Sequence, residues 1–212
     1  MKKFTLLLTV LFMASISFQT MAQSNREDAK KEMKKEKREI KQQAKKWRKK
    51  GYSEAPGAQS MEKQIYEVYI RNMEFDKNGK PIYLVSTGIF TGETESAAKV
   101  AALETAKRDV ASKLGSEIIG NVKTNIRNKQ LKKDAVSVTE VITKSEALIQ
   151  QELGTFEPLT EFYKETDNGN IQCALQIAYD KKEALEIAKN VIRKQLEQKL
   201  NLDEKEVSDL LD

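Results

Sequence analysis

The chain has 212 residues, of which 37 are Lys or Arg and 32 are Asp or Glu, so its formal net charge is +5. This length suits one ordinary domain with appendages, or two very small domains. The chain contains no His and a single Cys. This composition excludes imidazole acid–base catalysis, the catalytic triads that need His, His-bearing zinc sites and an internal disulfide.

The charge is concentrated near the N-terminus. Residues 23–50 contain 13 Lys or Arg and 5 Asp or Glu, and two more cations stand at Lys2 and Lys3. Residues 51–212 contain 22 Lys or Arg and 27 Asp or Glu, a net charge of −5. The net positive charge of the chain therefore lies in its N-terminal region, and the remainder is mildly acidic.

The first 22 residues have the pattern of a cleaved secretory signal, with a basic start, an apolar run over 4–13 and small residues near Ala22. Cleavage after Ala22 is expected to leave Gln23 as the new N-terminus. The mature protein would then lack a transmembrane helix and would be periplasmic or secreted.

The alternative is an uncleaved membrane anchor. The apolar run is shorter than the roughly 20 residues that a spanning helix needs. The cations that follow it also oppose an anchor under the positive-inside rule. A lipoprotein signal would need a Cys at the cleavage point, whereas the one Cys is Cys173.

Residues 24–50 predict a solvated helix, because Glu, Lys, Arg, Gln and Ala dominate and neither Gly nor Pro interrupts them. Bulky apolar residues recur every seven positions, at Met33, Ile40 and Trp47. The stripe is thin, because Glu36 and Gln43 occupy positions where a coiled coil would place apolar residues. Three interpretations stay open: a helix that docks this stripe on the domain, a weak self-associating coiled coil, and adhesion to anionic lipid or envelope polymers.

Adhesion would use the cations of this basic helical arm. They are Lys30, Lys31, Lys34, Lys35, Lys37, Arg38, Lys41, Lys45, Lys46, Arg48, Lys49 and Lys50. Nucleic acid is not expected as a partner, because an exported protein meets little of it and the arm has one aromatic residue instead of an interleaved set. The oligomeric state is left open.

A linker, a helix, a turn and a strand are predicted next, over 51–57, 58–74, 76–81 and 82–90. A strand over 65–70 is the alternative to part of that helix. Gly88 within the predicted strand indicates close approach by a neighbouring backbone or helix.

The strongest predicted element is a helix over 94–119, with Thr94 or Ser96 as its N-cap. Its apolar face is expected to consist of Val100, Leu103, Val110, Leu114 and Ile118. Its small residues are Ala97, Ala98, Ala101, Ala102 and Ala106. Small side chains let a helix lie close to a sheet, in agreement with Gly88 in the preceding strand.

The following residues are harder to assign. The polar stretch 120–134 is expected to hold a short strand over 121–126 and a loop. Residues 136–153 predict another helix, although the Val and Thr content of 135–143 would also suit a strand.

A hairpin is predicted from 155–165 and 171–179, because Asn168-Gly169 supplies the positive φ angles of a tight turn. Asp180 is expected to cap a final helix over 181–200.

The acidic tail 203–212 follows the domain expected over 58–202. The whole is predicted to be α+β, a small antiparallel or mixed sheet packed by the long Ala-rich helix and the C-terminal helix, preceded by the basic helix.

No motif predicts catalysis. The glycines do not have phosphate-loop spacing, and no carboxylate cluster has calcium-loop spacing. Cys173 lies in a predicted strand, where a buried thiol is expected. Catalysis by two carboxylates that meet only in space is left open by the sequence. We therefore expect a protein that is not an enzyme, with no catalytic residues, cofactor or metal.

The pattern of Gly88, the Ala-rich stretch 95–114, a second amphipathic segment and the hairpin over 155–179 resembles a bacterial envelope family. It is similar to the LPP-twenty lipoproteins and to the related N-terminal domain of the flagellar protein FlgT, over about 80–190. The resemblance implies a small α+β domain of the cell envelope with a structural or assembly role. Unlike the lipoproteins, this chain has no lipid-bearing Cys after its signal, so it is expected to be periplasmic or released.

Overall fold

The computed structural model describes residues 31, 33–129, 134–154, 156 and 158–212. The expected signal segment lies outside these residues. The chain divides into two compact units, the first ending at Lys46 and the second running from Trp47 to Asp212. A basic helix over 33–49 accounts for most of what is described of the first unit.

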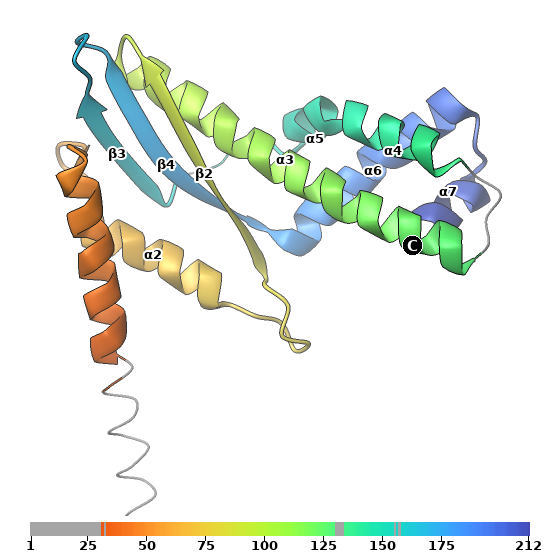
Figure 1. Ribbon diagram of the computed structural model, residues 1–212, viewed down its shortest axis with the longest axis horizontal. Coiled ribbons are helices and arrows are strands. Elements are labelled where there is room, and N and C mark those ends of the chain that lie inside the picture. The colour runs from red at the N-terminus through yellow and green to blue at the C-terminus, as the bar shows by residue number, and fades with distance from the viewer. Residues whose placement is uncertain (1–30, 32, 130–133, 155, 157) are drawn as a thin grey trace, which may run out of the picture. The chain divides into compact units, whose positions relative to one another are not determined.

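The second unit is built on a four-stranded antiparallel sheet with the strand order β1-β3-β4-β2 (Figure 1). The strands are β1 (Ser53–Glu54), β2 (Tyr83–Gly92), β3 (Thr160–Glu165) and β4 (Ile171–Asp180). The helices are α2 (Met61–Met73), α3 (Glu95–Asn128), α4 (Ala135–Lys144), α5 (Glu146–Glu152), α6 (Lys181–Leu200) and α7 (Glu204–Leu211). The predicted α+β class, with a long Ala-rich helix on the sheet, is confirmed.

Helix α3 packs against β2 and β4 through its alanines. Thr94 is its N-cap and accepts a hydrogen bond from the Ala97 N–H. Ala102 is fully buried, and a Cβ placed on Gly88 would lie only 1.8 Å from its carbonyl oxygen. The predicted close approach is thus confirmed. The prediction that Val100 belongs to the buried apolar face is wrong, because this side chain is 59% exposed.

Helix α3 is longer than predicted and runs beyond the sheet (Figure 1). The prediction of a strand over 121–126 is wrong, because Val122 extends the buried face of the helix. The Asn125 side-chain amide donates to the Leu210 carbonyl at 2.9 Å, which ties this end to α7. The polar side chains of this stretch therefore cover one side of a helix that is buried on the other.

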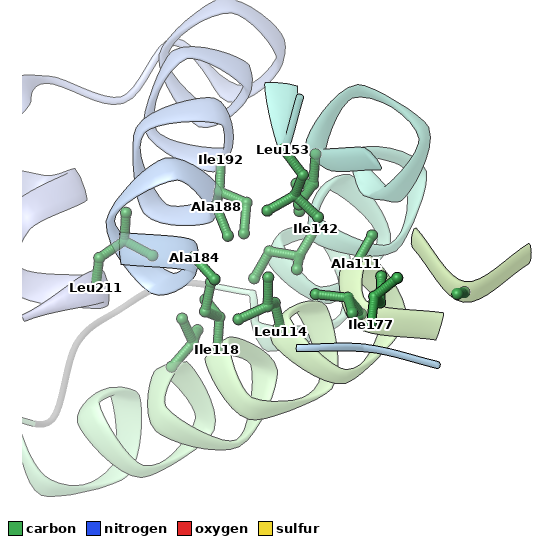
Figure 2. Packing of buried hydrophobic residues seen from close by; sticks show 14 of the residues in the cluster. Ala111, Leu114, Ile118, Ile142, Leu153, Ile177, Ala184, Ala188, Ile192 and Leu211 are labelled. Atoms are coloured by element: carbon green, nitrogen blue, oxygen red, sulfur yellow. The ribbon is translucent and has the colours of Figure 1, made fainter. Parts of the chain in front are cut away.

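One hydrophobic core joins the second half of α3 to the sheet and to α4–α7. Figure 2 shows Leu114 and Ile118 of α3 facing Ile142 of α4 and Ala184 and Ala188 of α6. Small side chains on α6 let it lie close to α3. The C-terminal helices thus pack into the same hydrophobic core as one face of the sheet.

Residues 135–143 are helical, so the strand alternative is wrong. Asp134 caps α4 by accepting hydrogen bonds from the N–H groups of Val136 and Ser137. Ser145 separates α4 from α5, and its hydroxyl donates to the Val141 carbonyl at 2.7 Å. The Asp134 cap favours a helix over a strand in this stretch, which forms two short helices. The helix predicted over 58–74 is also confirmed, as α2.

The predicted hairpin is confirmed as β3 and β4, although β3 begins only at Thr160. Gly169 has φ +75°, whereas the φ angle of Asn168 is not positive. Only one of the two residues therefore adopts the predicted positive φ. The N–H of Gly169 donates to the Thr166 carbonyl at 2.9 Å, closing the turn. Asp180 caps α6 as expected, accepting from the Glu183 N–H.

Two segments expected to lie outside the domain carry regular structure. The predicted linker 51–57 contains β1, which pairs with β3. The acidic tail 203–212 contains α7, whose Val207, Leu210 and Leu211 are buried. The periodicity of these three residues accounts for the helix, and their burial makes the tail part of the core.

Candidate anion-binding surface

The basic helix ends in a fixed structure within the second unit. Gly51 has φ +85°, and its N–H donates to the Arg48 carbonyl at 3.0 Å, a glycine-terminated helix end. Trp47 stacks edge-on against Tyr52, with ring centroids 5.0 Å apart, and lies 5.7 Å from the ring of Phe162. The half-buried ring of Trp47 therefore packs this end of the helix against aromatic residues next to β3.

Within the first unit, six neighbouring side chains line one shallow depression of about 380 Å³ on the basic helix. We call it the basic groove; it is lined by Lys34, Lys37, Arg38, Lys41, Gln42 and Lys45. All six side chains are exposed. Their spacing of three and four residues places them on one face of an α-helix.

The groove lies between two ridges of the helix surface. Residues four apart form a ridge along an α-helix. One ridge carries Lys37, Lys41 and Lys45. The other carries Lys34, Arg38 and Gln42. Five cations thus flank one groove, at intervals of about 6 Å along each ridge.

No acidic residue lies three or four positions from any of these five cations. Glu36 and Glu39 fall on the far side of the helix at about 100° per residue. Lys35, outside the groove, does have Glu32 and Glu39 at such positions. The sequence therefore leaves the groove without intrahelical neutralisation. Like charges at these spacings destabilise a helix by roughly 0.2–0.5 kcal/mol a pair, and an anion in the groove would relieve that repulsion.

Arg48 is engaged elsewhere. Its guanidinium forms two hydrogen bonds with the carboxylate of Glu62, one of them 2.8 Å long, and lies 3.6 Å from Glu54. The bonds to Glu62 raise the pKa of Arg48, against a smaller opposing effect of burial. This predicted surface cation is therefore exposed but already paired with a carboxylate of the second unit.

The remaining predicted cations are placed apart from the groove. Lys35 and Lys46 are exposed and rotated by about 100° from Lys34 and Lys45. Lys50 lies over the Trp47 ring, 5.4 Å from its centroid. Lys31 and Lys49 are exposed but do not line the groove. Lys30 lies outside the described residues.

Sequence reasoning missed two residues. Gln42 completes a ridge of the groove, and its position four residues after Arg38 was a signal for it. Glu62 pairs with Arg48, and nothing local predicted this, because the two residues lie 14 apart and meet only through the fold.

Other kinds of site find little support in the part of the chain that the structure describes. No group of three or more His, Cys, Asp or Glu there could hold a metal ion. Cys173 is buried as expected, and burial raises the pKa of its thiol to about 11. Within the described ranges, no helix has the length and apolar character that crossing a membrane requires.

Comparison with known proteins adds no assignment. No family model matches the chain, and no curated protein matches it.

Proposed function

We propose that the chain is an exported, non-enzymatic protein of the bacterial cell envelope with a structural or protein-interaction role, and that it binds an anionic partner through the basic groove. The observation that carries the second part is the gathering of five unneutralised cations around one groove. Cations placed together without counter-charges favour association with anions and accelerate it.

The first part rests on the signal pattern before Gln23 and on the resemblance to LPP-twenty and FlgT-type domains. The contact of Gly88 with an Ala-lined helix face supports that resemblance, since the Gly-bearing strand and the Ala-rich helix are the pattern on which it rests. The α+β unit then serves as a scaffold, and the basic helix as its adhesive element.

Fractionation with N-terminal sequencing tests export. We expect the protein in the periplasm or the medium, starting at Gln23; a cytoplasmic protein starting at Met1 would contradict export. This result is independent of the groove.

Co-sedimentation with envelope fragments tests the groove. The wild-type chain should associate at low salt and be released as ionic strength rises, because exposed charges are screened beyond about 8 Å at physiological ionic strength. A variant with all five groove cations replaced by Gln should associate far less. If wild type and variant sediment alike, the groove is not the binding element.

A further inference from the structure

The shape of the basic groove allows its partner to be specified further. Resting on the proposal that the groove binds an anion, we infer that its occupant is a linear acidic polysaccharide, a single chain that lies along the groove with carboxylates facing the flanking cations.

Two parallel rows of cations flank the groove. A single polymer chain can lie between the two ridges and meet cations on both sides. Lys37 and Lys41 flank the groove on one ridge, and Lys34 and Arg38 on the other. From Lys34 to Lys45 the helix rises about 16 Å, with cations at steps of about 4–6 Å. An anionic polymer with a regular repeat of similar length would pair with them in series.

The basic helix also lacks a broad apolar face of the kind that enters a bilayer. Helices that lie in a bilayer interface bury a broad face of Trp, Phe and Leu. Between residues 33 and 46 the bulky apolar residues are Met33 and Ile40, and the side opposite the groove carries Glu36, Glu39 and Gln43. Polar contacts, chiefly of charge, therefore have to supply the affinity.

The chemistry of the lining also fits a chain of separate anionic groups. Four of the five cations are Lys, compact charges with rotatable donors, and the fork of Arg38 can meet a carboxylate with two hydrogen bonds. The amide of Gln42 offers a donor and an acceptor, which matches sugar hydroxyl groups. The groove has no aromatic side chain on which a nucleic acid base could stack. This combination favours a carboxylated sugar polymer.

The test compares two double variants of the full chain, Lys34→Gln with Lys45→Gln and Lys35→Gln with Lys46→Gln. Both remove two exposed cations, and each position of the second pair is one residue along the same helix. The probes are polygalacturonate, monomeric galacturonate, and vesicles of phosphatidylglycerol with phosphatidylcholine. Affinities are measured by calorimetry at one ionic strength, with helicity checked by circular dichroism.

Polygalacturonate should bind the first variant roughly 30-fold more weakly than wild type, at about 1 kcal/mol for each cation near an anionic surface. The second variant should lose less than about threefold, and the monomer should bind far more weakly than the polymer.

Equal losses in both variants would overturn the groove as the site while leaving anion binding in place. Vesicles bound as tightly as the polymer, at equal anion concentration, would overturn the choice of polysaccharide. If wild type binds neither the polymer nor vesicles, the proposed anion binding itself fails.

Discussion

Replacing Gly88 by Ala should destabilise the domain more than any surface change. The new Cβ would lie 1.8 Å from the Ala102 carbonyl oxygen, 2.8 Å from its carbonyl carbon and 3.0 Å from the Ala106 nitrogen. A carbon–oxygen contact normally needs about 3.3 Å, so α3 and β2 would have to separate by about 1.5 Å. All three atoms are backbone, and no side chain can rotate away to make room.

Overpacking of a core costs ~1–3 kcal/mol, and a clash between two backbones belongs at the upper end, so we expect a loss of about 3 kcal/mol. With a urea dependence of ~2 kcal/mol per molar, the unfolding midpoint should fall by about 1.5 M. Circular dichroism at 222 nm follows the transition. A midpoint within about 0.25 M of wild type would refute the close-approach argument.

Gly120→Ala is the matched control. Gly120 lies in α3 and is exposed, and a Cβ there would meet no atom within 4 Å. Ala is favoured over Gly in a helix by about 0.5–1 kcal/mol, so this variant should be more stable than wild type. The same chemical change at Gly88 and Gly120 should therefore shift the midpoint in opposite directions.

Three further predictions concern other parts of the second unit. Asp203→Ala should cost about 1 kcal/mol and make α7 susceptible to proteolysis, because it removes the capping box with Glu206; unchanged stability and protease resistance would contradict this role. The hydrogen bond from Lys107, opposed by partial burial, holds the pKa of Glu104 below its ordinary 4.5. The ionised carboxylate stabilises the fold, and this effect is lost as the pH falls through its lowered pKa. The free energy of unfolding of Glu104→Gln should therefore be lower than that of wild type at pH 7, and the two values should converge in acid. A difference in stability between the two proteins that grows as the pH falls would contradict this prediction. Iodoacetamide should modify Cys173 at pH 8 only after unfolding, since the thiol is buried and has a pKa of about 11; rapid labelling of the native protein would show otherwise.

The sequence predicted those elements whose signals are local. Asp180 was identifiable as a cap and Thr94 as one of two candidates with Ser96. The Gly169 turn was identifiable as a hairpin apex and Gly88 as a contact point, because each depends on a few adjacent residues. The end of α3 was different. Residues 121–126 are polar by composition, yet Val122 is buried and the Asn125 amide bonds to Leu210 of α7, 85 residues later. A distant partner of this kind leaves no mark on the local pattern.

The candidate site shows the same division. The charge count located the basic helix but treated its cations as equivalent. Helical geometry places Lys34 and Lys45 on the groove face. It places Lys35 and Lys46 about 100° away, and the spacing of the residues alone would have predicted this difference. The pairing of Arg48 with Glu62 was not predictable in this way, because it required α2 to be folded beside the last turn of the helix.

The groove also carries a cost that bears on its role. Lys41 stands three or four residues from Lys37, Arg38 and Lys45, and Lys34 stands at such a spacing from Lys37 and Arg38. These five like-charge pairs oppose the helix by roughly 1–2.5 kcal/mol in total, at about 0.2–0.5 kcal/mol each. Neutral Gln at Lys41 would remove three of them and favour the helix. The arrangement is therefore unfavourable for the isolated helix, and an anion in the groove would relieve it, which is why we propose this face as a binding surface.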